Sequence, residues 1–332
     1  MSVESAATFL PYAALIQEFY VGGQNICLGF PTQELYEKHN VPAFGSSIGR
    51  VANRIQGGLV KNLNGRDYQI FQNDGNNTCH GGKLGWHKKV WDGPKTVEKN
   101  GKKALEFKLL SKDGDENFPG TVETRVYYSV HKEGDGDNAK TVLEMEYECE
   151  FVGDECEETI VNLTNHNYFN IGDCPTIEGT EVVLASDLYL PVDSTGIPTG
   201  NPERYPDIEV TKPFLLGETA PDVDNTFVMT TNPEVPIDTR SLPLKLNAAF
   251  KHVRTGINLE VHSTEPAFQF YTGKYIDVPA VGGAPARGAR AGFAVEPHRF
   301  VNACNVPEWR NQVLLKKGQT YGSKIVYKAW KA

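Results

Sequence analysis

The sequence predicts an all-β protein, a large antiparallel β-sandwich. Apolar and polar residues alternate with a period of two along many short segments, which is typical of strands with one buried face. Turn residues separate these segments, with 32 Gly and 20 Pro in the chain to supply them. Helical periodicity is confined to residues 31–38, where Thr32 is a candidate N-cap. Because this pattern lacks the crossover helices that parallel strands require, we expect antiparallel sheets packed face to face.

The clearest strand covers residues 143–151, in which five apolar residues alternate with four glutamates. The loop at residues 131–140 is rich in Gly and Asp and is expected to join this strand to the preceding one as an antiparallel pair. The glutamates expected to form a solvated face are Glu144, Glu146, Glu148 and Glu150. The other alternating segments cover residues 105–109, 122–130, 159–164, 257–261, 268–270, 293–295 and 325–327.

One domain is expected over residues 1–332, because no linker, low-complexity tract or repeat divides the chain. The 33 basic and 42 acidic residues give a net charge of −9, and no run of Lys or Arg could follow a phosphate backbone. Nucleic acid and anionic membranes are therefore not expected partners. The amino terminus lacks the basic region of a signal peptide, and no segment reaches the ~20 apolar residues of a membrane helix, so a cytoplasmic protein is expected. Six scattered cysteines without a metal-binding spacing are expected to be free thiols, and no metal site is expected.

The segment 161–170 begins as a strand and ends in a dense set of polar side chains. His166 shares the parity of Thr164, so it is expected to leave the sheet on the polar face. An imidazole at that place can move a proton near neutral pH, because its unperturbed pKa is about 6.5. The neighbours that would add donors and acceptors for a ligand with many hydroxyls are Asn165, Asn167 and Tyr168.

The segment 45–55 carries two arginines between glycines. The fork of donors on Arg50 or Arg54 can bracket a pair of sugar oxygens. On spacing alone, the alternative is that both arginines pair with carboxylates and hold a turn.

The segment 76–91 contains a Gly81-Gly82 pair, which allows close approach of the backbone. Trp86 or Trp91 could offer a ring on which the C–H face of a pyranose stacks. The alternative is a Gly-Gly turn beside a core tryptophan.

The segment 294–298 places Glu296 on the polar face at the end of a strand, and Pro297 is expected to stop the strand pairing. A lone glutamate before a proline is usually a surface residue, so this segment alone does not identify a catalytic group.

The four segments together match one family. The chain resembles the aldose 1-epimerases, also called galactose mutarotases, over nearly its whole length. The fold that this resemblance implies is the galactose mutarotase-like supersandwich. The motifs that carry the resemblance are Gly-Arg-Val-Ala-Asn-Arg-Ile at 49–55, His-Gly-Gly at 80–82 with Gly85, Trp86 and Trp91, Phe-Pro-Gly at 118–120, Asn-Leu-Thr-Asn-His-Asn-Tyr-Phe-Asn at 162–170, Asp-Val-Asp-Asn-Thr-Phe at 222–227 and Gln-Phe-Tyr-Thr-Gly at 269–273.

The resemblance implies an enzyme that opens and recloses a free aldohexose. Glu296 would take the proton of the C1 hydroxyl, and His166 would protonate the ring oxygen. His166 must then start protonated, and the charge of Glu296 or Asp224 is expected to favour that form. No cofactor or metal is implied, and a monomer or weak homodimer is expected. The residues that would hold the sugar are Asn53, Arg54, His80, Asp224 and Gln269.

The chain departs from the family pattern at three places, which leaves the preferred sugar open. Residues 297–302 read Pro-His-Arg-Phe-Val-Asn where the family usually has Pro-Gln-x-Phe-Pro-Asp. Asn167 stands where many members carry Thr or Ser, and Asn225 stands where His is frequent.

Three other functions stay open on the sequence. A hexose-6-phosphate epimerase needs a cationic cluster for the phosphate. A non-catalytic sugar-binding protein could use the same fold, and a glycoside hydrolase normally needs two carboxylates, of which only Glu296 is well placed. The cations that a phosphate could recruit are Lys83, Lys88, Lys89, Arg287 and Arg290.

Overall fold

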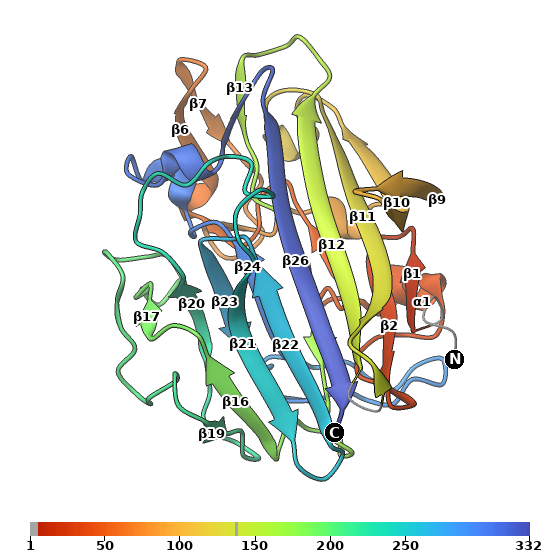
Figure 1. Ribbon diagram of the computed structural model, residues 1–332. Helices are drawn as coiled ribbons and strands as arrows, with labels where there is room; N and C mark the ends of the chain where they lie inside the picture. The colour runs from red at the N-terminus through yellow and green to blue at the C-terminus, as the bar shows by residue number, and fades with distance from the viewer. Residues whose placement is uncertain (1–5, 137–138) are drawn as a thin grey trace.

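The computed structural model describes residues 6–136 and 139–332, which form two large antiparallel sheets facing each other (Figure 1). The larger sheet has nine strands in the order β19-β16-β21-β22-β26-β12-β11-β10-β9, and the smaller has six in the order β15-β24-β23-β20-β17-β18. The prediction of an all-β antiparallel sandwich is confirmed.

The strands of the larger sheet are β9 (Asp92–Lys99), β10 (Lys102–Ser111), β11 (Val122–Glu133), β12 (Lys140–Phe151), β16 (Thr180–Leu184), β19 (Phe214–Leu215), β21 (Lys245–His252), β22 (Ile257–Ser263) and β26 (Thr320–Lys331). Those of the smaller sheet are β15 (Tyr168–Phe169), β17 (Leu188–Tyr189), β18 (Glu203–Arg204), β20 (Asp224–Val228), β23 (Ala267–Tyr271) and β24 (Phe293–His298). Every strand predicted at 105–109, 122–130, 143–151 and beyond residue 257 is present, and each is longer than its alternating pattern.

Smaller elements close the ends of the sandwich. A three-stranded sheet consists of β1 (Ala7–Leu10), β2 (Leu15–Val21) and β3 (Gln24–Asn25). Four two-stranded pairs are β4 (Ser46–Ile48) with β14 (Thr164–His166), β5 (Arg54–Ile55) with β8 (Thr78–Cys79), β6 (Leu59–Leu63) with β7 (Arg66–Gln69), and β13 (Glu158–Ile160) with β25 (Leu314–Lys316). The short helices are α1 (Gln33–His39) and the 3₁₀ turns η2 (Gln56–Gly58), η3 (Trp86–Lys88), η4 (Asp115–Asn117), η6 (Ala303–Asn305) and η7 (Arg310–Gln312).

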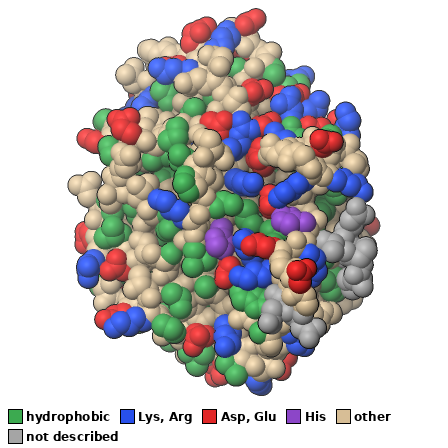
Figure 2. All heavy atoms as spheres, in the orientation of Figure 1, with side chains coloured by type: hydrophobic (Ala, Val, Ile, Leu, Met, Phe, Trp, Pro, Cys, Tyr) green, Lys and Arg blue, Asp and Glu red, His purple; other side chains and the backbone are tan. Residues whose placement is uncertain are grey.

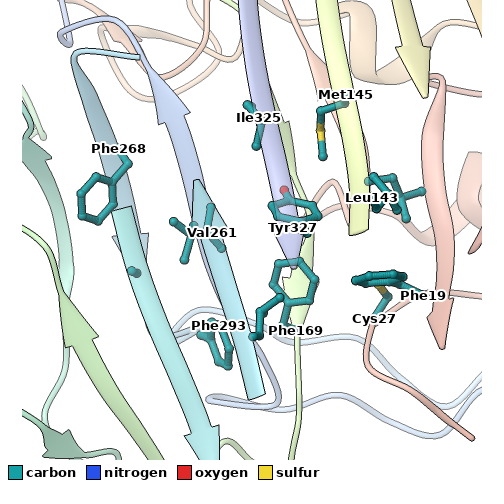
Figure 3. Packing of buried hydrophobic residues seen from close by; sticks show 14 of the residues in the cluster. Phe19, Cys27, Leu143, Met145, Phe169, Val261, Phe268, Phe293, Ile325 and Tyr327 are labelled. Atoms are coloured by element: carbon teal, nitrogen blue, oxygen red, sulfur yellow. The ribbon is translucent and has the colours of Figure 1, made fainter. Parts of the chain in front are cut away.

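The core fills the space between the two sheets (Figure 3). Tyr327 of β26 projects from the larger sheet onto Phe169 of the smaller one, with ring centroids 5.0 Å apart, and Phe169 lies beside Phe293; all three side chains are fully buried. Phe250 of β21 stacks on Phe293 with ring centroids 4.1 Å apart. Burial of each such side chain stabilises the fold by roughly 1.5–3 kcal/mol. The face of the smaller sheet that carries these side chains is therefore held against the larger sheet, and its opposite face points away from the core.

The outer face of the larger sheet carries interspersed acidic and basic side chains (Figure 2). Its glutamates are ion-paired rather than freely solvated: Lys99 Nζ lies 3.2 Å from Glu146 and 2.5 Å from Glu148, and Arg240 also contacts both carboxylates. Glu146 is only 8% exposed. The predicted solvated face is therefore a network of ion pairs.

Three local predictions were wrong in detail: the cap at Thr32, the single strand at 159–164 and the end of strand pairing at Pro297. Thr32 occupies the N-cap of α1, but its side chain makes no capping hydrogen bond, and the helix begins at Gln33. The segment expected as one strand at 159–164 is divided among β13 and β14, because Asn162 between them pairs with Arg50 and Ala52 of a different segment. The chain thus changes its pairing partner within a few residues.

Pro297 does not stop strand pairing. It lies inside β24, opposite Phe268 of β23. On the other side of β24, the strand β15 pairs only with Phe293 and Ala294 among the described residues. Pro297 lies beyond this pairing, so on that side of β24 no backbone N–H is needed for a hydrogen bond between strands.

Two predictions fall partly outside the described ranges. The loop expected at residues 131–140 includes residues 137 and 138, which lie outside the described residues. The amino terminus, for which no signal peptide is expected, includes residues 1–5, which also lie outside them. Within the described ranges, no helix has the length and apolar character needed to cross a membrane. All six cysteines are free thiols.

Candidate active site

The candidate site is a cleft on the face of the smaller sheet that points away from the core. Alternation along β23 sends Phe268 and Phe270 into the core and Gln269 to the opposite face. The register places Thr226 of β20, Gln269 of β23 and Glu296 of β24 side by side in one row. The row forms the polar floor of the cleft.

The cleft consists of two adjoining hollows. The inner hollow, of about 360 Å³, is lined by His80, His166 and Glu296 among others. The outer hollow, of about 750 Å³, is lined mainly by neutral polar residues such as Asn76 and Thr195. The residues that line both are Asn53, Arg54, Asp224, Gln269 and Tyr275.

His166 and Glu296 are in direct contact in the inner hollow. His166 is the last residue of β14 and Glu296 lies in β24, and His166 Nε2 is 3.3 Å from Glu296 Oε2. Their side chains are only 7% and 4% exposed. The fold therefore brings together the two residues to which the resemblance assigned the acid and base roles, although they are far apart along the chain.

Burial shifts the pKa values of this pair toward the uncharged forms. It lowers the pKa of His166 to about 4, and it raises the pKa of Glu296 well above its usual value, with the nearby Asp224 adding to the rise. The expectation that Glu296 or Asp224 keeps His166 protonated is therefore wrong, because burial of the imidazole is the largest cause of its shift and lowers its pKa. Both shifts favour a neutral imidazole beside a protonated carboxyl.

His80 presents a hydrogen-bond donor to the cleft. The backbone N–H of Asn53 donates to His80 Nδ1 over 3.3 Å, so in the neutral ring the other nitrogen carries the proton. Burial, followed by the neighbouring His166, holds the pKa of His80 well below its usual value. The rings of His80 and His166 meet edge to face with centroids 5.1 Å apart.

One potential ligand atom from each of His80, His166 and Glu296 lies within 4.8 Å of the other two. The fold thus creates a possible metal-binding cluster that no spacing in the sequence indicates. A neutral His80 that offers N–H rather than a lone pair suits a sugar oxygen better than a cation.

The floor of the cleft is held by a hydrogen-bond network centred on Gln269. Thr226 Oγ1 donates to Gln269 Oε1 over 2.5 Å, and Gln269 Nε2 donates to Asp224 Oδ1 over 2.7 Å. Asn53 Nδ2 also reaches Gln269 Oε1 at 3.4 Å. Burial raises the pKa of Asp224, while Gln269 and Arg54 oppose the rise. These contacts orient three of the five residues predicted to hold the sugar.

The two arginines of segment 45–55 have different roles. Arg54 lines both hollows, and its Nε donates to Asp74 Oδ2 over 2.7 Å. Arg50 is 1% exposed and donates to the carbonyls of Pro119 and Gly120, so it holds a turn inside the protein. Arg50 is therefore not a binding residue.

Neither tryptophan of segment 76–91 is available to a sugar. Trp86 and Trp91 are each 2% exposed and pack edge to face in the core. The Gly-Gly turn beside a core tryptophan is the interpretation that holds. Gly81 has φ +82°, and a Cβ there would lie 2.0 Å from the carbonyl oxygen of Gly49, so the turn requires glycine.

Two polar neighbours of His166 also point away from the cleft. Asn165 donates to the Gly45 carbonyl, and Asn167 donates to Cys27 Sγ, both in the buried interior. Tyr168 does line the inner hollow. These asparagines hold the strand that carries His166 rather than contacting a ligand.

The sequence analysis missed two tyrosines of the cleft, Tyr271 and Tyr275. Tyr271 shares the parity of Gln269 on β23, so the strand pattern could have identified it. Tyr275 lies in the loop after β23, where no periodicity gives a direction. Of the five cations considered for a phosphate, only Lys88 lines either hollow within the described residues.

A family model described as aldose 1-epimerase matches residues 3–328. The bifunctional protein GAL10 of Pachysolen tannophilus is 38% identical over 324 residues, which cover 96% of this chain and 44% of that protein. The chain thus spans less than half the length of this relative. The galactose mutarotase of Sus scrofa is 34% identical over 303 residues, which cover 90% of this chain and 81% of the relative. A solved structure, the GalM/aldose epimerase homologue from C. elegans, has a TM-score of 0.81 and 26% identity, covering 98% of this chain and 95% of that one.

Proposed function

Because the chain belongs to the aldose 1-epimerase family, we propose that it interconverts the α and β anomers of a free aldohexose such as galactose or glucose. The observation that carries this proposal is the buried contact of 3.3 Å between His166 and Glu296 at the base of a polar cleft. An acid and a base that share one proton can open a hemiacetal, since one proton must leave the sugar as another arrives.

We propose the following course for the reaction. Hydroxyl groups of the entering sugar hydrogen-bond to Glu296, and its proton passes to His166. The carboxylate then takes the proton of the C1 hydroxyl while His166 protonates the ring oxygen, which breaks the bond between that oxygen and C1. Rotation about C1–C2 and reversal of both proton transfers close the ring on the other face. Each complete cycle returns the shared proton, so no redox change or external acid is needed.

The remaining polar groups are proposed to orient the sugar. His80 would donate its free N–H to the ring oxygen or a nearby hydroxyl, and Arg54 would donate from the guanidinium that Asp74 holds. Asn53, Asp224 and Gln269 are linked through Gln269, so their positions are fixed before a ligand arrives.

The competing functions are less well supported. A phosphate would find Lys88 alone among the proposed cations, and Lys88 Nζ already donates to the Lys83 carbonyl. A silent sugar-binding protein has no need for a buried acid–base pair in the cleft. Asp224 does supply a second carboxylate beside Glu296, so glycoside hydrolysis is the alternative that the experiment must also test.

The test is polarimetry of freshly dissolved α-D-galactose and α-D-glucose in weakly catalysing buffer. Wild-type protein should accelerate mutarotation, whereas Glu296→Gln and His166→Asn should each lose about 100- to 10,000-fold in rate. Methyl β-galactoside cannot mutarotate and should bind both variants. It should also remain intact with the wild type, because its release as galactose would indicate a hydrolase. Near-normal rates in either variant would refute the assigned roles.

We further propose that residues 1–332 act as one domain in the cytoplasm, as a monomer or weak homodimer without nucleic acid. One core cluster contains residues from Ala7 to Ala329, which supports a single folding unit. Six free thiols suit a reducing compartment, and the net charge of −9 disfavours nucleic acid. Sedimentation velocity at several protein concentrations tests the assembly state.

A further inference from the structure

The cleft has an aromatic wall that differs from the one that the sequence suggested. With both tryptophans buried, the rings that line the inner hollow besides its histidines are Tyr168, Tyr271 and Tyr275. Tyr168 and Tyr271 are nearly buried, at 3% and 9% exposure, and their rings meet edge to face. Tyr275 is 75% exposed, so it is the most exposed of the three rings, and Lys274 Nζ lies over it at 5.7 Å from the ring centroid.

The exposed ring of Tyr275 stands on a well-held backbone. Its N–H donates to the hydroxyl of Tyr271 over 2.6 Å. On one side, Lys274 pairs with Asp222 at 2.6 Å, and on the other, Ile276 is 3% exposed and packs in a core cluster. The backbone position from which the ring projects is therefore set by the fold. A large, anchored and exposed aromatic surface beside a cleft is typical of a binding residue.

Tyr275 borders the inner and the outer hollow, close to the residues proposed to hold the sugar. It shares the lining of both hollows with Asp224 and Gln269. The inner hollow is also lined by Val41, which is 89% exposed. The mouth of the inner hollow thus combines a polar floor with apolar groups from two distant segments, which suits a pyranose with hydroxyls at its edge and C–H groups on its face.

We propose that Tyr275 is the stacking surface for the pyranose ring and that it favours galactose over glucose. This inference rests on the proposed function for its ligand, a free hexose. In galactose the axial hydroxyl at C4 leaves the hydrogens of C3, C4 and C5 together on one face, which forms a continuous apolar patch. In glucose the C4 hydrogen lies on the opposite face from those of C3 and C5, so that patch is interrupted. A flat ring therefore contacts galactose over a larger area.

The test measures binding of methyl β-galactoside and methyl β-glucoside by calorimetry, with the sugars locked so that no turnover is needed. Tyr275→Ala should weaken binding of the galactoside about 3- to 10-fold and that of the glucoside by a smaller factor. Tyr275→Phe keeps the ring and should bind both like the wild type. Tyr275→Leu keeps an apolar group without a flat face and should resemble Tyr275→Ala. Phe71→Ala removes a ring that is 49% exposed and lines neither hollow, so it should change nothing.

Each outcome decides part of the proposal. Unchanged galactoside binding in Tyr275→Ala would overturn it, as would a loss of equal size in Tyr275→Phe, which would indicate that the hydroxyl acts instead. Equal losses for both glycosides would overturn the galactose preference while the stacking role stands. The failure of the proposed function would look different: glycosides would bind with the expected pattern, but wild-type protein would not accelerate mutarotation.

Discussion

Replacing His298 with glutamine should make the protein more resistant to acid. His298 is fully buried two residues after Glu296, and it stands where the family usually has Gln. Its Nδ1 contacts the carbonyl of Arg299, whereas Nε2 has no hydrogen-bond partner among the described residues. Burial lowers the pKa of His298 to about 4, so the folded protein keeps this ring neutral while the unfolded chain protonates it near pH 6.5.

The sign and size of the effect follow from proton linkage. As the pH falls below 6.5, His298 binds a proton in the unfolded state but not in the folded state. The free energy of unfolding therefore decreases until about pH 4, where the folded state also binds the proton. With pKa values of about 4 folded and about 6.5 unfolded, the loss is roughly 2–3 kcal/mol at pH 4.5 and well below ~1 kcal/mol at pH 7. Glutamine does not titrate, and its amide can still donate to the Arg299 carbonyl. His298→Gln should therefore gain roughly 2 kcal/mol over wild type at pH 4.5 relative to pH 7.

Urea unfolding of both proteins at pH 7.0, 6.0, 5.0 and 4.5 would measure this difference. The matched control is His262→Gln. His262 is partly exposed on the outer face of the larger sheet, with Nε2 3.1 Å from Glu260. Because this side chain is 19% exposed and lies against a carboxylate rather than in the core, the control should show no gain in acid. A stability difference between His298→Gln and wild type that stays constant from pH 7.0 to 4.5 would refute the argument that burial keeps His298 neutral.

Four further outcomes are expected. Gly81→Ala should lose roughly 1–3 kcal/mol or more of stability in urea unfolding, because its Cβ would meet the Gly49 carbonyl at 2.0 Å and its φ of +82° is unfavourable for alanine; an unaffected variant would contradict the close approach. Extended dialysis against a chelator should leave mutarotation unchanged, and activity restored only by added metal would contradict the metal-free mechanism. Lys88→Ala should retain galactose turnover, whereas selective loss of activity on glucose 6-phosphate would support the phosphorylated substrate. The rate should show no transition near pH 6.5 from an ordinary imidazole, since burial lowers the pKa of His166 to about 4; a pH–rate transition centred near pH 6.5 would contradict the lowered pKa of His166.

The strand pattern predicted the fold well where one face of a strand meets the core. Residues 143–151 alternate without interruption, and β12 buries Leu143, Met145, Tyr147 and Cys149 completely. The pattern failed where the chain changes partners, as at Asn162, because the pairing is decided by backbone groups of Arg50 and Ala52 that a single segment does not reveal. Strand alternation predicts the face of the sheet on which each side chain lies. It does not predict which other segment of the chain pairs with the strand or packs on that face.

The same limit applies to the site. Arg50 and Arg54 share one motif and one residue type, yet one holds a turn and the other lines the cleft. Contacts with distant segments distinguish them: Arg50 donates to the carbonyls of Pro119 and Gly120, whereas Arg54 donates to Asp74. Tyr275 could not be predicted at all, since its direction depends on a loop anchored by Tyr271 and Asp222. The chemical groups that a motif can offer were predictable from its residue types. The direction in which side chains such as those of Arg50 and Tyr275 point was not predictable, because it depends on contacts with distant segments.

The state of the shared proton links the fold to the choice of substrate. Burial of His166 and Glu296 would be costly if both were charged, and it is tolerated because one proton leaves the pair uncharged at rest. A neutral hexose can enter such a site without adding charge, and its hydroxyls replace the water that the carboxylate would need. A phosphate would bring about two negative charges into a cleft whose arginine, Arg54, is already paired with Asp74. Under the proposed function, the burial that moves both pKa values toward the neutral forms would therefore also favour free sugars over phosphorylated ones.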